Sequence, residues 1–82
     1  QNVLKIYPNP TNGEVVIDIE LQEEKNPQLK LYNVTGQLLR EISLKTENNK
    51  YQLDLSDYTN GVYFVSIVFE NQIVTRKVIL NK

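Results

Sequence analysis

The sequence predicts an all-β fold: an immunoglobulin-like antiparallel β-sandwich of about seven strands with Greek-key connections. The first observation is a hydrophobic period of two, as in Val15, Ile17 and Ile19, which alternate with other side chains. The second is the recurrence of such segments at a spacing of roughly 8 to 12 residues, between stretches rich in turn residues. The third is the lack of any convincing apolar stripe at helical spacing.

Seven segments carry this pattern, and we expect each to form a strand. They are residues 3–7, 14–21, 28–33, 37–44, 51–55, 62–69 and 73–80. In segment 37–44 the period places Leu38, Ile42 and Leu44 on one face. Segment 62–69 is apolar on both faces, which predicts a central strand covered on both sides. Residues 22–27 and 45–50 are polar and predict loops.

Turn chemistry separates the predicted strands. All three glycines, Gly13, Gly36 and Gly61, come just before a strand, where a tight turn with positive φ is expected. Pro8 and Pro10 fix their own φ angles and push the preceding residues toward extended conformations. We therefore expect "YPNP" to be a stiff arm that leads into the Asn-Gly turn. Because proline donates no hydrogen bond, the arm is also expected to end pairing along that edge.

One tyrosine favours the immunoglobulin-like arrangement in particular. Tyr63 lies two residues after Gly61 and two before Val65. In immunoglobulin-type domains, a tyrosine two residues before a core position hydrogen-bonds back across a corner. Tyr58 is a competing candidate for this corner hydroxyl, and Tyr63 as a simple core aromatic is the remaining alternative.

Composition limits the possible functions. The 82 residues contain no cysteine and no histidine, so a Cys/His zinc site or a Ser-His-Asp triad cannot form within them. We expect no cofactor, no metal and no enzymatic activity. Asp54, Asp57 and Asn60 are possible calcium ligands, but turn capping explains them better. Asn33 begins a formal glycosylation sequon, "NVT", which we interpret as a turn.

Charge and length limit the possible partners. The net charge of −1 predicts no binding to nucleic acid, and no apolar run approaches the ~20 residues of a membrane span, so direct membrane insertion is not expected. The length fits one domain. Because the chain starts with Gln1 and has no signal peptide, we interpret it as a piece of a longer protein.

The last twelve residues carry Arg76, Lys77 and Lys82 and no acid. Two interpretations of this segment remain open. The charges either blunt an exposed edge strand against uncontrolled pairing, or mark a recognition edge that another protein reads by strand addition. An exposed terminal strand also allows a homodimer through that edge.

Four blocks in order, "YPNPTNG", "LYNVTGQ", "LDLSDYTNGVYFVSI" and "TRKVILNK", resemble the C-terminal sorting domain of the type IX secretion system of Bacteroidetes-type bacteria, type A. The resemblance covers residues 6–82. The matching family positions are Pro8, Asn9, Pro10, Gly13, Leu31, Tyr32, Asn33, Gly36, Gln37, Leu55, Gly61, Tyr63, Val65 and Ile67. The resemblance also points to Thr75, Arg76, Lys77, Val78, Ile79, Leu80 and Lys82 as secretion-recognition candidates, since the family needs its last strand for export.

The resemblance implies a function. Residues 1–82 would be a single C-terminal sorting domain, with 1–7 partly linker and first strand, on a larger secreted protein. It would direct an N-terminal cargo from the periplasm across the outer membrane, to the cell surface or the medium. Its partners would be the outer-membrane translocon and shuttle proteins and a sortase-like peptidase that removes the domain upstream of the first block. The alternative is a β-sandwich adhesion or carbohydrate-binding accessory module.

Overall fold

A computed structural model describes residues 3–20, 27–44, 50–70 and 72–82. It contains seven strands: β1 (Val3–Tyr7), β2 (Glu14–Glu20), β3 (Gln28–Tyr32), β4 (Leu38–Ser43), β5 (Lys50–Asp54), β6 (Gly61–Val68) and β7 (Ile73–Leu80). The described residues form no helix, and hence none that is long and apolar enough to cross a membrane. The all-β prediction and the seven strands are confirmed.

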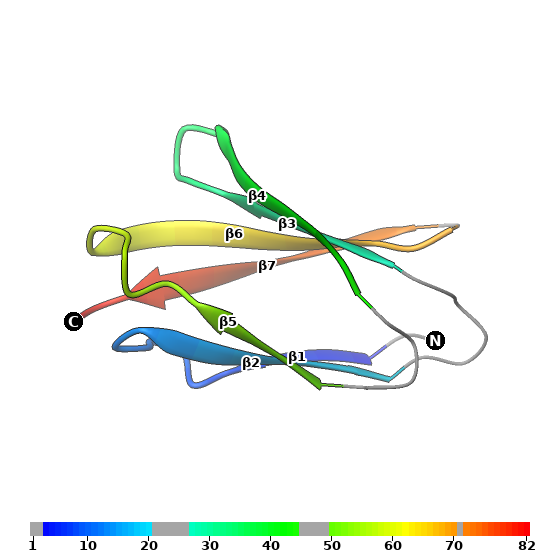
Figure 1. Cartoon of the computed structure of the whole chain (residues 1–82), viewed down its shortest axis with the longest axis horizontal. Helices are drawn as coiled ribbons and strands as arrows, with labels where there is room; N and C mark the ends of the chain where they lie inside the picture. Colours follow the sequence, from blue (N-terminus) through cyan, green and yellow to red (C-terminus); the bar gives the residue numbers. More distant parts are fainter. Residues whose placement is uncertain (1–2, 21–26, 45–49, 71) are drawn as a thin grey trace.

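The strands form two antiparallel sheets that face each other (Figure 1). One sheet has the order β1-β2-β5 and the other the order β4-β3-β6-β7. The chain therefore crosses between the sheets after β2, after β4 and after β5, as in an immunoglobulin-like sandwich. The fourth strand pairs with β3, whereas in the constant-type immunoglobulin arrangement it joins the other sheet.

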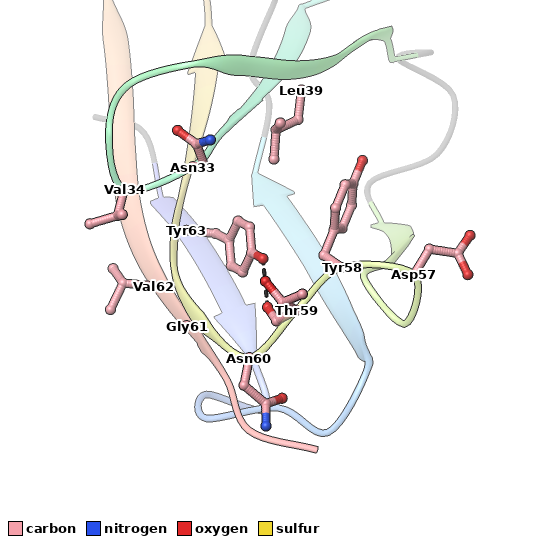
Figure 2. A pocket seen from close by; sticks show the side chains of 10 residues that line it. All are labelled: Asn33, Val34, Leu39, Asp57, Tyr58, Thr59, Asn60, Gly61, Val62 and Tyr63. Atoms are coloured by element: carbon pink, nitrogen blue, oxygen red, sulfur yellow. Dashed lines mark hydrogen bonds between the residues drawn. The ribbon is translucent and has the colours of Figure 1, made fainter.

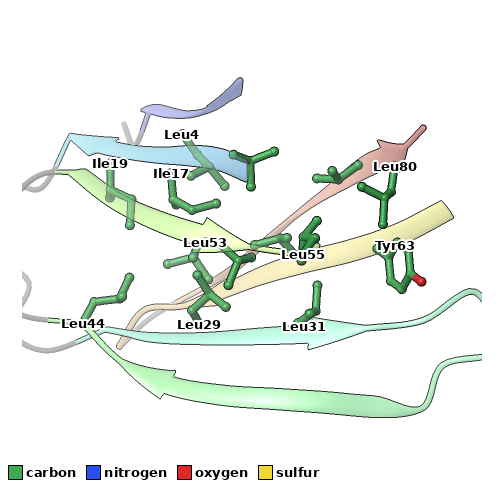
Figure 3. Close-up of a cluster of buried hydrophobic side chains, with 14 of the residues drawn as sticks. Leu4, Ile17, Ile19, Leu29, Leu31, Leu44, Leu53, Leu55, Tyr63 and Leu80 are labelled. Carbon is green, nitrogen blue, oxygen red and sulfur yellow. The ribbon is translucent and has the colours of Figure 1, made fainter. Parts of the chain in front are cut away.

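The core lies between the two sheets and consists of the inward residues of the alternating segments (Figure 3). Its buried hydrophobic members are Leu4, Val15, Ile17, Ile19, Leu29, Leu31, Leu44, Leu53, Leu55, Tyr63, Val65, Ile67, Phe69, Val78 and Leu80. Both β6 and β7 contribute to it, so the terminal strand is part of the core and not an appendage.

The predicted inward face of β4 is wrong at its first residue. Leu38 is 46% exposed. A β-bulge causes this: Arg40 pairs with Leu31, but Leu38 pairs with the next residue, Tyr32, so Leu39 is the extra residue. The bulge reverses the alternation, and Leu39 packs against the core in place of Leu38.

The prediction for β6 is half right. It lies between β3 and β7, as a central strand should. Its outer face is not covered, however, since Val62, Phe64 and Val68 are only partly buried. The four-stranded sheet turns this face to solvent; on it, Ser66 is buried and its hydroxyl lies 2.8 Å from that of Thr75.

The two predicted polar loops fall mostly outside the described residues, at 22–26 and 45–49, and so does the predicted inward position of Leu21.

Candidate recognition end of the sandwich

The four sequence blocks contribute to one end of the sandwich, the end at which β7 finishes (Figure 1). We call this the motif end and define it as residues 8–13, 33–37, 55–61 and 77–82. The start of β1 lies toward the opposite end of the long axis, along which the domain extends 35 Å. Segments far apart in the sequence therefore meet here.

The arm before β2 pairs with the outer edge of β7. Asn9 Nδ2 donates to the Lys77 carbonyl (2.8 Å), and the Ile79 amide donates to Asn9 Oδ1 (2.9 Å). The Thr11 amide donates to the Ile79 carbonyl (2.9 Å), and the Asn81 amide donates to the Thr11 carbonyl (2.8 Å). A short parallel bridge thus ties the β1–β2 connection to the other sheet.

This pairing corrects the expectation that the proline arm ends hydrogen bonding at its edge. The prolines donate nothing, and both of their peptide bonds, Tyr7-Pro8 and Asn9-Pro10, are cis. The residues next to them, Asn9 and Thr11, supply the bonds instead. "PNPTNG" does turn the chain into β2, and it also closes part of the edge of the terminal strand.

Thr11 organises the turn that follows. Its side chain is 2% exposed; Oγ1 donates to the Glu14 carbonyl (2.6 Å) and accepts from the Gly13 amide (3.1 Å). The Gly13 carbonyl accepts from the Leu55 amide (2.7 Å), which joins this turn to the β5–β6 connection. Sequence reasoning did not single out Thr11. A hydroxyl residue between Pro10 and Asn12 was the available signal, and nothing local shows that it is buried.

The prediction of a positive φ is confirmed at two of the three glycines. Gly36 (φ 90°) and Gly61 (φ 153°) have positive φ, as predicted. Gly13 does not, which contradicts the prediction. It is buried against the β5–β6 connection, where a Cβ would lie 3.7 Å from Ser56 Cβ, an ordinary contact distance.

The corner tyrosine is Tyr63. Its hydroxyl donates to the Thr59 carbonyl (2.6 Å), four residues upstream, and its ring is buried (Figure 2). Tyr58 packs beside it, with ring centroids 5.7 Å apart and planes at 44°. The immunoglobulin-like corner is confirmed, and the competing candidate supports it by packing.

The basic C-terminal residue is bound to the same connection. Lys82 Nζ donates to the carbonyls of Tyr58 (2.7 Å) and Ser56 (3.0 Å), and the Lys82 amide donates to Asn60 Oδ1 (2.9 Å). An ammonium that is held by two carbonyls fixes the end of the chain against the β5–β6 connection.

The Asn33–Gln37 turn completes the motif end. Asn33 Oδ1 accepts from the Thr35 amide (3.1 Å), the Thr35 hydroxyl (2.9 Å) and the Gln37 amide (2.9 Å). Asn33 Nδ2 donates to Gln37 Oε1 (3.0 Å). The predicted turn at the formal sequon is confirmed. Together with residues 57–63, Asn33 lines an open depression of about 390 Å³ (Figure 2).

Asp54, the last residue of β5 and the neighbour of the motif end, caps a turn. Asp54 Oδ1 accepts from the Ser56 amide (2.9 Å), and hydrogen bonds from the Ser56 hydroxyl and amide lower the pKa of Asp54. Asn60 is engaged by Lys82, and Asp57 is exposed. Among the described residues, no group of three or more His, Cys, Asp or Glu side chains is placed to hold a metal ion.

The recognition candidates divide into exposed and buried residues. Thr75, Arg76, Lys77 and Lys82 are exposed, Ile79 is half-buried, and Val78 and Leu80 are buried. Of the family positions, Leu31, Leu55, Tyr63, Val65 and Ile67 are core residues. The others belong to the turns of the motif end or, in the case of Tyr32, to the end of β3.

The fold and this end define a small immunoglobulin-like module whose characteristic residues shape a surface and hold a terminal strand. The family model for the secretion system C-terminal sorting domain matches residues 5–81, and the chain belongs to this family. It is also 27% identical, over 62 residues, to beta-agarase A of Zobellia galactanivorans. That match covers 76% of this chain and 11% of the agarase, so the chain spans only a small part of that relative.

Membership of this family defines the function. The domain is a C-terminal sorting signal of the type IX secretion system, and a sorting signal is not a catalyst. It implies attachment to an N-terminal cargo domain and export to the cell surface or the medium.

Proposed function

We propose that residues 1–82 are a single sorting domain, with 1–7 partly linker and first strand, that takes a larger secreted protein from the periplasm across the outer membrane. The observation that carries this proposal is the assembly of all four sequence blocks at the motif end. The first strand starts toward the other end (Figure 1). A cargo joined before β1 therefore leaves the motif end accessible to export proteins.

The export proteins recognise a folded surface in this proposal. Val78 and Leu80 are buried, so a partner reads them only through the shape that they support. Thr75, Arg76, Lys77 and Lys82 supply the exposed groups, and half-buried Ile79 lies between them. The partners are the translocon and shuttle proteins of the type IX system, followed by a sortase-like peptidase that cleaves upstream of Pro8.

An export assay tests the proposal. Residues 1–82 are fused to the C-terminus of a periplasm-directed fluorescent protein in a bacterium with a working type IX system, with a translocon-deficient strain as the control. Fluorescence at the surface or in the medium, lost in the control strain, is the expected result. Intact fusion trapped in the periplasm of both strains would refute the proposal.

Truncation of residues 73–82 is a weaker test. We expect it to abolish export, but it removes Val78 and Leu80 from the core as well as the exposed groups. The resulting defect combines lost folding with lost recognition. Point variants that keep the core intact separate the two.

One observation favours the alternative function, a carbohydrate-binding module. Tyr7 is 41% exposed on the outer face of the three-stranded sheet, beside Val16 and Gln52 in an open depression that Lys50 also lines. Exposed aromatic rings can stack on sugar rings. Binding of the fusion to an insoluble polysaccharide, lost in Tyr7→Ala, would support this alternative; unchanged binding in Tyr7→Ala would exclude a role for this ring.

A further inference from the structure

The outer edge of β7 has two halves with different hydrogen bonding. In an antiparallel pair, successive residues alternate between bonding the partner strand and pointing away from it. The amide and the carbonyl of Ile79 both bond to the Asn9–Thr11 arm, so these backbone groups face away from β6. By the same alternation, Lys77 and Thr75 also direct their backbone groups to the outer edge.

The half nearer the C-terminus is closed. The arm occupies the Lys77 carbonyl, both groups of Ile79 and the amide of Asn81. The other half is open: by this alternation the amides of Thr75 and Lys77 face outward, and no hydrogen bond from either is found among the described residues. Arg76 Nη1 donates to the Thr75 carbonyl (3.1 Å), an exposed contact that a competing donor can replace.

We propose that the open half, Ile73 to Lys77, is a strand-addition site for one short acidic segment of an export protein. This inference rests on the proposed function and adds a partner site outside the motif end, with which the open half shares only Lys77. Unpaired edge groups supply the main-chain bonds of such an addition, and the side chains on both faces supply specificity.

The length and charge of the open half specify the occupant. The Asn9–Thr11 arm blocks extension beyond Lys77, so the incoming strand pairs with about five residues. Arg76 and Lys77 are exposed, and residues 71–82 contain no acid to neutralise them. Acidic side chains opposite these two residues complete the pairing. A second copy is disfavoured, because its own β7 would bring two more positive charges to the same edge.

Two substitutions at one position test the edge in the export assay. Thr75→Pro and Thr75→Val both lose the hydroxyl contact with Ser66, but only proline removes the outward amide. Because that amide does not bond β6, the β6–β7 pairing is kept in both variants. We expect export of Thr75→Pro to fall about tenfold below that of Thr75→Val. Equal export of the two variants, with wild type exported, would overturn the edge site and leave the proposed function intact.

A second variant keeps the test decisive if Thr75→Pro destabilises the fold. If Thr75→Pro melts below Thr75→Val, the double variant Arg76→Glu/Lys77→Glu replaces it, since both side chains are exposed. Export that falls without a change in Tm supports the site, and unchanged export overturns it. Size-exclusion chromatography of the fusions identifies the occupant: a wild-type dimer that Thr75→Pro separates, with export unchanged, would make the occupant a second copy and overturn the acidic-strand proposal.

Discussion

Two asparagines of the motif end do similar work over very different distances. Asn33 makes all of its side-chain hydrogen bonds within four residues of itself, to Thr35 and Gln37. Asn9 makes its bonds to Lys77 and Ile79, which lie 68 and 70 residues further along the chain. One side chain closes a turn, whereas the other closes the edge of a sheet.

The difference shows which part of this end depends on the whole fold. The side-chain bonds of the Asn33 turn lie within its own five residues, so the turn does not depend on the other sheet. The Asn9 junction, by which we mean the hydrogen bonds between residues 9–11 and β7, exists only when both sheets are assembled and β7 is in place. A partner that detects the Asn9 junction therefore detects a completed domain, which fits the proposal that export proteins recognise a folded surface.

The largest expected effect comes from the core side of the junction. Leu80 is 1% exposed and sits at the bridge to Thr11. Leu80→Ala should lower the free energy of unfolding by about 2–5 kcal/mol, because it leaves a cavity where the two sheets join. Thermal or urea unfolding measures this loss. Ile79→Ala, at a half-buried neighbour, is the matched control, and a loss as large as that of Leu80→Ala would contradict the assigned facing of β7.

The second largest effect is expected when the Asn9 side chain is removed from the junction. Asn9→Ala removes two hydrogen bonds and should lower the free energy of unfolding by about 2 kcal/mol, at roughly 1 kcal/mol for each bond. Hydrogen exchange locates the damage: the amide of Ile79 should exchange faster, although the substitution lies 70 residues away.

Asn33→Ala is the matched control for this experiment. It should speed exchange at the amides of Thr35 and Gln37 and leave Ile79 protected. If Asn9→Ala left the Ile79 amide unchanged, or if Asn33→Ala exposed it, the contrast between a local and a long-range asparagine would fail.

The same contrast explains what the sequence could predict. Strand positions, the Tyr63 corner and the Asn33 turn depend on neighbours within a few residues, so periodicity and turn chemistry identify them. The Asn9–β7 bonds and the Lys82 contacts join segments that have no local relation, and no pattern specifies them. The bulge that turns Leu38 outward belongs to the same class, because it appears only once β3 is paired with β4.

A smaller effect tests the local turn itself. Gly36 has φ 90°, a conformation that costs a residue with a Cβ about 1 kcal/mol or slightly more. Gly36→Ala should lower stability by that amount in thermal unfolding. Gly13→Ala is the control: its φ is not positive and its Cβ finds an ordinary contact, so its stability should stay within about 0.5 kcal/mol of wild type. Equal losses would mean that backbone conformation does not distinguish the two turns.

The smallest effect is electrostatic and concerns the Asp54 cap. The Ser56 hydroxyl and amide hold the pKa of the Asp54 carboxyl below its ordinary value of 3.8. A lowered pKa in the folded state means that the charged cap stabilises the fold above pH 3.8 and loses this contribution as the pH falls through the folded value. Asp54→Asn keeps an acceptor for the Ser56 amide but removes the charge, so its stability should fall slightly below wild type at pH 6. The two should converge as the pH is lowered below 3.8, as followed by urea unfolding at each pH. A difference that stays constant down to the lowest pH would show that the cap acts through its shape alone and that the carboxylate charge contributes nothing to the β5–β6 connection.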